Sequence, residues 1–134
     1  MPESDTHLRL VLSLRNWVLD SILAGDGGLL FADVALASAE RRPPSIEGFV
    51  PDIYAGSSRS GFVIGEAKTI RDLETAHTYA QLCAFLRHCN QKSESLLVLA
   101  VPWHATRRAR NLVRLLQIRQ GTCVTVKILE ELRV

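Results

Sequence analysis

The stretch that decides the fold is Val50-Pro51-Asp52-Ile53-Tyr54, followed after a polar connection by Phe62-Val63-Ile64-Gly65-Glu66-Ala67-Lys68. Both runs are rich in apolar residues that favour strands. Residues 55–61, between them, are the small and polar residues of a turn. The sequence therefore predicts a β-hairpin, and three charged side chains interrupt its otherwise apolar strands.

These three charges gather on one patch of the predicted hairpin. Successive strand residues point to opposite faces of a sheet, so Glu66 and Lys68 share a face and Ala67 points away. Pairing of the two strands brings Asp52 next to Glu66. Two carboxylates held together repel one another, and one of them takes up a proton unless a cation lies between them. A hard divalent cation such as Mg²⁺, which needs only one or two carboxylates, suits this patch.

The spacing of these residues resembles a known signature. Pro51-Asp52, thirteen residues and then Glu66-Ala67-Lys68 is similar to the motif of the PD-(D/E)XK nuclease superfamily. That group includes restriction-type endonucleases, Holliday-junction resolvases and viral-type replication-repair nucleases. The resemblance implies a restriction endonuclease-like fold, in which an αβββαβ core forms a mixed central sheet flanked by helices. It also implies hydrolysis of DNA phosphodiester bonds with Mg²⁺ or Mn²⁺.

The rest of the chain supplies the elements that such a core requires. In chain order, the sequence pattern predicts a helix over 6–24, strands over 29–38, 46–55 and 61–69, a helix over 70–89, a strand over 95–101, a helix over 105–118 and a strand over 123–129. The last helix and strand extend the core. With 134 residues and 47% hydrophobic content, the chain is expected to form a single domain over 1–134.

The resemblance also implies roles for individual residues. Asp52 and Glu66 would bind the metal together with the backbone carbonyl of Ala67. Lys68 would orient or activate the attacking water, or balance charge in the transition state. Gln81, in the predicted helix after the third strand, would support the lysine or reach the phosphate.

Many members of this superfamily add an acidic metal ligand from the first helix. Asp20 is the acid in the body of that predicted helix, with Asp33 and Glu47 as rivals. The number of metal ions stays open between one and two. His77 and His104 are further candidates for an acid or base, although a lone histidine more often has a structural or surface role.

A basic run near the end of the chain is a candidate for nucleic-acid binding. It consists of Arg107, Arg108, Arg110 and Arg114, and it contains no acid. Arginine binds phosphate through a planar fork of donors, so one face of this predicted helix can follow a DNA backbone. A solvated basic face is the alternative. The formal net charge of the whole chain, +2, is too small to indicate nucleic acid by itself.

No sequence feature indicates export or membrane insertion. No apolar run reaches membrane length, and residues 1–5 lack the basic start of a secretory signal, so the expected location is cytoplasmic. Cys83, Cys89 and Cys123 have no spacing typical of a zinc site. We expect three reduced and largely buried thiols.

Two alternatives stand beside a structure-selective or non-specific deoxyribonuclease. One is a catalytically inactive nuclease-fold module that binds nucleic acid. The other is an interaction module whose basic helix docks on an acidic protein partner. Duplex, flap, junction and single-stranded DNA are all open as substrates, and so is RNA. Because many small members of the superfamily work in pairs, a homodimer is a further expectation.

Overall fold

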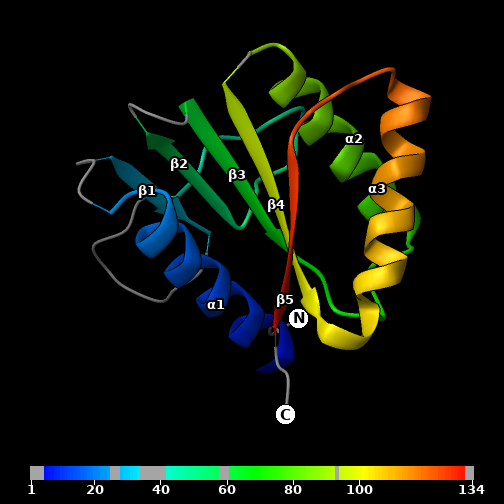
Figure 1. Cartoon of the computed structure of the whole chain (residues 1–134), viewed down its shortest axis with the longest axis horizontal. Helices are drawn as coiled ribbons and strands as arrows, with labels where there is room; N and C mark the ends of the chain where they lie inside the picture. The colour runs from blue at the N-terminus through cyan, green and yellow to red at the C-terminus, as the bar shows by residue number, and fades with distance from the viewer. Residues whose placement is uncertain (1–4, 25–27, 34–41, 58–60, 93, 132–134) are drawn as a thin grey trace.

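The computed structural model describes residues 5–24, 28–33, 42–57, 61–92 and 94–131 (Figure 1). The elements are α1 (Asp5–Ser21), β1 (Leu29–Ala32), β2 (Ile53–Ser57), β3 (Gly61–Ala67), α2 (Ala76–Asn90), β4 (Ser95–Pro102), a 3₁₀ turn (Trp103–Ala105), α3 (Thr106–Gln120) and β5 (Val126–Glu131). The predicted order of helices and strands is confirmed. The chain is an α/β protein with one mixed sheet in its described part.

The strands of this sheet follow one another in chain order, from β1 to β5 (Figure 1). The first three are antiparallel, whereas β4 and β5 are added in parallel to β3. Parallel neighbours need a crossover connection, which α2 and α3 provide. The carboxyl ends of β3 and β4 therefore lie at the same edge of the sheet as the start of β2.

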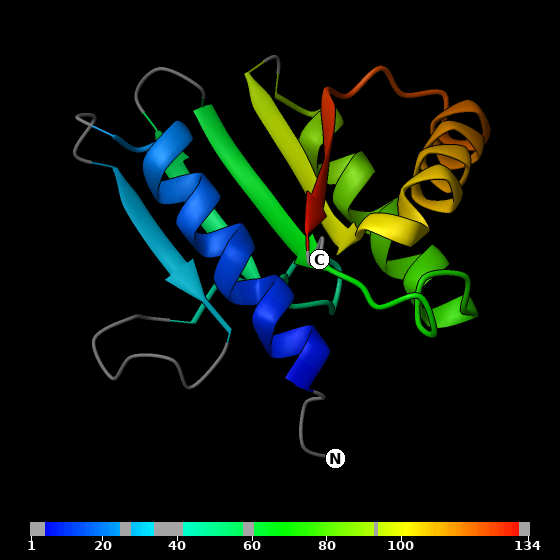
Figure 2. The same ribbon diagram turned by 60° about the horizontal axis from the view of Figure 1, so that its bottom comes forward.

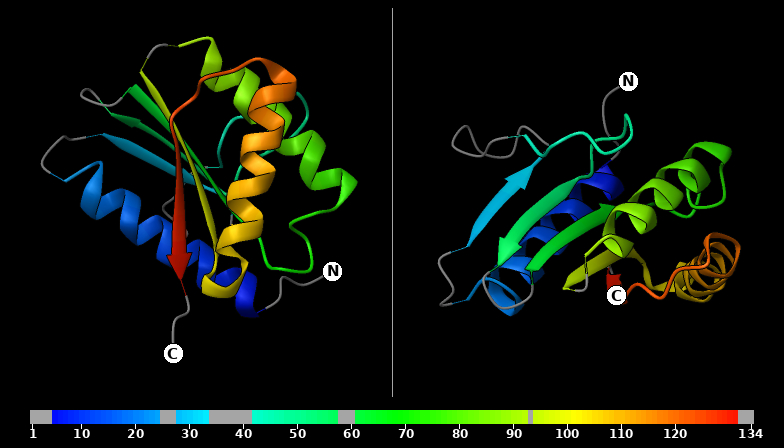
Figure 3. Two further views of the ribbon diagram at one scale, coloured as in Figure 1. Left: turned by 45° about the vertical axis from the view of Figure 1, so that its right-hand side comes forward. Right: turned by 90° about the horizontal axis from the view of Figure 1, so that it is seen from above.

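One helix covers one face of the sheet and two cover the other (Figures 2 and 3). In β3, Val63 and Ala67 pack with α1, whereas Ile64 packs with α2 and α3. Strand β4 contributes buried side chains to both cores, as the nearly apolar sequence of this strand predicts. These are Leu97, Leu99 and Val101 on the α2–α3 side, and Val98 and Ala100 on the α1 side.

The hairpin differs from the prediction at its outer ends. The strand predicted over 46–55 begins only at Ile53, because Glu47 and Gly48 have positive φ and turn the chain between Ile46 and Phe49. Asp52 therefore lies immediately before β2, and its predicted place inside a strand was wrong. The strand predicted over 29–38 ends at Ala32, and residues 34–38 lie outside the described residues. The strand predicted over 61–69 ends at Ala67.

The second predicted helix, 70–89, begins later, at Ala76. Residues 69–75 form a turn, and the Thr75 hydroxyl oxygen caps α2 by accepting a hydrogen bond from the Thr78 N–H at 3.1 Å. The Thr78 hydroxyl in turn donates to the backbone carbonyl of Asp72 at 2.6 Å. This turn carries the chain from the end of β3 to the start of α2.

Two further expectations concern membrane-spanning helices and the cysteines. None of the helices in the described ranges is long and apolar enough to cross a membrane. The three cysteines are free; Cys89 is buried and Cys83 is half-buried, but Cys123 is exposed, so the expectation of a buried thiol was wrong there. Burial raises the pKa of the Cys89 thiol to about 11. This thiol therefore behaves as a small core residue and is not a nucleophile at neutral pH.

Candidate active site

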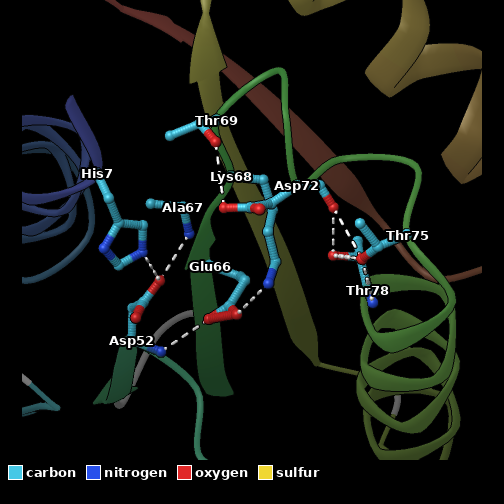
Figure 4. Close-up of polar contacts among 9 residues, drawn as sticks. All are labelled: His7, Asp52, Glu66, Ala67, Lys68, Thr69, Asp72, Thr75 and Thr78. Atoms are coloured by element: carbon cyan, nitrogen blue, oxygen red, sulfur yellow. Dashed lines mark hydrogen bonds and ion pairs between the residues drawn. The ribbon is translucent and has the colours of Figure 1, made fainter. Parts of the chain in front are cut away.

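Two carboxylates meet where β2 begins and β3 ends (Figure 4). The backbone N–H of Asp52 donates to Oε1 of Glu66 at 3.0 Å. The backbone N–H of Ala67 donates to Oδ2 of Asp52 at 2.9 Å. Both acids are buried, with Asp52 8% and Glu66 3% exposed. The predicted proximity of Asp52 and Glu66 is confirmed, and reciprocal hydrogen bonds to the backbone hold this carboxylate pair in place.

Lys68 supplies a positive charge beside the carboxylate pair. Its Nζ lies 3.5 Å from Oε2 of Glu66, and its side chain is largely buried (Figure 4). Lys68 directly follows the last residue of β3, so it reaches the same side as Glu66. Because solvent screens buried charges less than exposed ones, this contact offsets part of the repulsion between the two acids.

The environment of Glu66 changes its acidity. Burial raises the pKa of Glu66 well above its ordinary value, and the neighbouring Asp52 carboxylate raises it further. Lys68 lowers the pKa but does not outweigh those two causes. In the protein alone, Glu66 therefore keeps its proton at a pH where an exposed glutamate has lost it. A divalent cation bound here would release that proton, because carboxylate ligands must be ionised.

The first turn of α1 also reaches the carboxylate pair. Nε2 of His7 lies 3.4 Å from Oδ2 of Asp52, and the His7 side chain is 20% exposed (Figure 4). Sequence reasoning missed His7, because nothing in the local pattern of a helix start indicates what it faces. The signal is tertiary: α1 packs across β3 and β4 with its amino end at the edge that carries the acids.

The oxygen donors at this edge suit a hard divalent cation. The N–H and C=O of one strand residue point to the same side of the strand, so the carbonyl of Ala67 faces the side where its N–H meets Asp52. Continuing the β2–β3 register places Pro51 opposite Ala67, and proline has no N–H to donate to that carbonyl.

The number of side-chain donors limits which cation fits. Within the part of the chain that the structure describes, no group of three or more His, Cys, Asp or Glu side chains is arranged to hold a metal. A cation at this site would therefore be held by two carboxylates, one backbone carbonyl and water. Mg²⁺ is commonly bound in this way, with few protein ligands and several waters.

The other predicted site residues differ in their surroundings, and Asp20 lies far from the carboxylate pair. Asp20 is exposed in the last turn of α1, about 20 Å along the helix axis from His7 at 1.5 Å per residue. Gln81 is buried in α2, and its Oε1 accepts no hydrogen bond from the described residues. His77 and His104 each make a ring contact with an aromatic side chain.

The two rival acids pair with arginines. Oδ1 of Asp33 accepts a hydrogen bond from Arg42 at 2.9 Å, although the Asp33 N–H donates to the backbone carbonyl of Asp52. Glu47 pairs with Arg87 of α2 at 2.6 Å. This hydrogen bond from Arg87 lowers the pKa of Glu47. The carboxylates of both acids thus form ion pairs with arginines.

The predicted basic face lies on α3, where Arg107, Arg108, Arg110 and Arg114 are all exposed. Because α3 follows β4, Arg107 and Arg108 in its first turn lie at the edge of the sheet that carries the carboxylate pair. Arg110 and Arg114 lie further along and line a groove between α3 and β5. The structure therefore divides the four arginines between two places.

Comparisons with protein-family models, with curated proteins and with solved structures found no match to this chain. The fold and the site define an α/β protein with a buried acid–acid–lysine centre at one edge of a mixed sheet. Its function is inferred from that geometry.

The raised pKa of Glu66 predicts how stability depends on pH. The pKa is higher in the folded than in the unfolded chain, so wild type loses stability as pH rises above about 4.5, by up to 1.4 kcal/mol per pH unit until Glu66 ionises in the folded state. Glu66→Gln lacks this loss. We expect the variant to gain about 1 kcal/mol or more over wild type between pH 5 and pH 8, measured by urea unfolding.

Glu74→Gln, at an exposed glutamate before α2, is the matched control and should follow wild type at both pH values. Added Mn²⁺ should stabilise wild type at pH 8 more than it stabilises Glu66→Gln. Equal unfolding free energies for wild type and Glu66→Gln at both pH values would contradict the raised pKa.

Proposed function

We propose that this chain is a metal-dependent nuclease that hydrolyses DNA phosphodiester bonds, with the restriction endonuclease-like fold of the PD-(D/E)XK superfamily. The observation that carries the proposal is the buried pair of Asp52 and Glu66, with Lys68 3.5 Å from Glu66. Isolated charges are rarely buried in this way, and perturbed acids near a cation are typical of catalytic sites. The order of elements and the mixed sheet also support it.

The residues of the centre divide the chemistry among them. Asp52, Glu66 and the Ala67 carbonyl would hold Mg²⁺ or Mn²⁺, which supplies Lewis-acid stabilisation of charge on the phosphoryl group when bound. Lys68 carries an ammonium group with three donors. It stabilises the negative charge that develops on the phosphate and positions the attacking water.

Two further contacts orient the acids for this task. The Ala67 N–H and the His7 imidazole both approach Oδ2 of Asp52, so Oδ1 is the oxygen that would face the cation. Glu66 is fixed in the same way, because its Oε1 accepts from the Asp52 N–H while Oε2 faces Lys68. Such preorganisation reduces the rearrangement needed when substrate binds.

The DNA strand would be held by arginines at the same edge of the sheet. Arg107 and Arg108 are exposed in the first turn of α3, and their planar forks match phosphate oxygens. Contacts of this kind recognise the backbone without reading sequence. A nuclease that is structure-selective or non-specific follows from this arrangement.

A cleavage assay tests the proposed function. Labelled duplex, flap, four-way junction and single-stranded DNA, and one RNA, are incubated with Mg²⁺, Mn²⁺ or EDTA. We expect products with either cation, none with EDTA, and a loss of about a hundredfold or more in Asp52→Asn. The matched control is Asp20→Asn, the same change at the far end of α1, which should cleave like wild type.

Two outcomes would overturn the proposal. DNA bound equally by wild type and Asp52→Asn, with no cleavage under any condition, would favour the inactive binding module. Cleavage that persists in EDTA, or that Asp52→Asn and Asp20→Asn reduce equally, would show that the carboxylate pair does not hold the cation.

A further inference from the structure

A groove of about 860 Å³ lies between α3 and β5, two elements that run side by side in Figure 3. Six of the residues that line it are Arg110, Arg114, Ile118, Val126, Lys127 and Ile128. We propose that this α3–β5 groove binds an extended segment of another protein that presents both acidic and apolar side chains to the groove. This inference concerns a second surface and does not depend on nuclease activity.

Strand β5 offers the backbone for such a segment. It is the last strand of the sheet and pairs with β4 along one side. Within residues 5–24, 28–33, 42–57, 61–92 and 94–131, no strand pairs with its other side. The edge of a sheet presents N–H and C=O groups to which an extended peptide can add as a further strand.

The apolar lining sets the pattern of the side chains that would enter. Val126 and Ile128 are half-buried and pack against the core on the α2–α3 side. Ile118, opposite them on α3, is 72% exposed. An added strand points every second side chain to one face, so apolar residues among those that enter the groove would meet these three groups.

Charge identifies the occupant. Arg110, Arg114 and Lys127 line the groove, and none of its lining residues is an acid. A second copy of the chain would bring the same three cations to the contact, where like charges repel. A nucleic acid would leave the apolar lining unused, and the groove has no aromatic side chain on which a base could stack. An acidic segment with apolar side chains satisfies both the charge and the lining.

The test uses a fluorescein-labelled synthetic peptide of Glu-Glu-Ile-Val repeats, in which each face of the extended strand carries both acidic and apolar side chains, and the same peptide with lysine in place of glutamate. Fluorescence anisotropy should show saturable binding of the glutamate peptide and none of the lysine peptide. The double variant Arg110→Glu, Arg114→Glu should weaken binding by about tenfold or more. The double variant Arg108→Glu, Arg119→Glu has the same net charge on the same helix but lies outside the groove, so it should bind like wild type.

Two further measurements separate groove binding from general charge attraction. Ile118→Ser, at an exposed position, should weaken binding several-fold without loss of folding, because it removes apolar contact area only. A peptide that is N-methylated at alternate residues along one edge lacks the donors for one ladder. Of two such peptides, one for each edge, the peptide methylated on the edge that faces β5 should lose affinity.

Four outcomes would overturn the inference. The first is no saturable binding of the glutamate peptide, and the second is an equal effect of the two double variants. If duplex DNA displaces the peptide, and DNA binding depends on Arg110 and Arg114 but not on Ile118, the groove would be assigned to nucleic acid. A dimer in sedimentation that Ile118→Ser dissociates would assign it to a second copy of the chain.

Discussion

Replacing Lys68 with methionine is expected to reduce the rate of DNA cleavage by about a thousandfold, the upper end of the effect of removing one preorganised charge from an active site. The Lys68 Nζ lies 3.5 Å from Glu66 in a largely buried position, where a positive charge is poorly replaced by solvent. Methionine keeps most of the length of the side chain and removes the charge. Single-turnover cleavage with saturating Mg²⁺ measures the effect on the chemical step.

The control for this variant is Lys92→Met, the same change in an exposed loop, which should leave the rate unchanged. Mn²⁺ binding, followed by calorimetry, should persist in Lys68→Met, because Asp52, Glu66 and the Ala67 carbonyl are all retained. Loss of cleavage together with retained Mn²⁺ binding separates a role in the reaction from a role in holding the cation. A rate within a few-fold of wild type would remove Lys68 from the proposed chemistry.

The proximity of Asp52, Glu66 and Lys68 was predictable because it depends on short-range rules. Strand alternation puts Glu66 and Lys68 on one side, and hairpin pairing brings Asp52 to Glu66. Both contacts are present, at 3.5 Å between Lys68 and Glu66 and at 3.0 Å between the Asp52 N–H and Glu66. Neither result requires knowledge of how the helices pack.

Contacts that depend on helix packing were not predictable from the sequence. An acid from α1 was expected at the site, but α1 crosses the sheet with its amino end at the carboxylate pair, so His7 reaches Asp52 and Asp20 lies at the other end. The direction of α1 is decided by which residues of β3 and β4 it covers, and local periodicity carries no such information. The placement of Arg110 and Arg114 beside β5 likewise depends on how a helix, here α3, packs on the sheet.

The residues at which α2 and β2 begin depend on single backbone groups, and a pattern of apolar residues gives no information on these groups. Thr75 starts α2 by accepting from the Thr78 N–H, whereas periodicity alone extended the helix back to residue 70. Glu47 and Gly48 have positive φ and turn the chain, so the strand predicted from residue 46 begins only after Asp52. As a consequence Asp52 sits outside the regular ladder, where its own N–H is available to Glu66.

Gly61 is the backbone position where substitution is expected to be most damaging. It starts β3 with a φ of +68°, and a Cβ at this position would lie 1.8 Å from the backbone carbonyl oxygen of Glu94. That neighbour is main chain next to β4, so it cannot rotate away as a side chain would. We expect Gly61→Ala to lower the free energy of unfolding by about 3 kcal/mol, which combines a left-handed backbone with a steric clash. Urea unfolding at constant pH measures the loss.

Two other glycines separate these two causes. Gly121 has a φ of +64° at the end of α3, but a methyl group there would meet no atom within 4 Å, so Gly121→Ala should cost only the backbone strain, about 1 kcal/mol. Gly56 has open space and no positive φ, so Gly56→Ala should be neutral or slightly stabilising. The expected order of stability is therefore Gly56→Ala, then Gly121→Ala, then Gly61→Ala. Equal losses for Gly121→Ala and Gly61→Ala would mean that the start of β3 does not pack closely against Glu94.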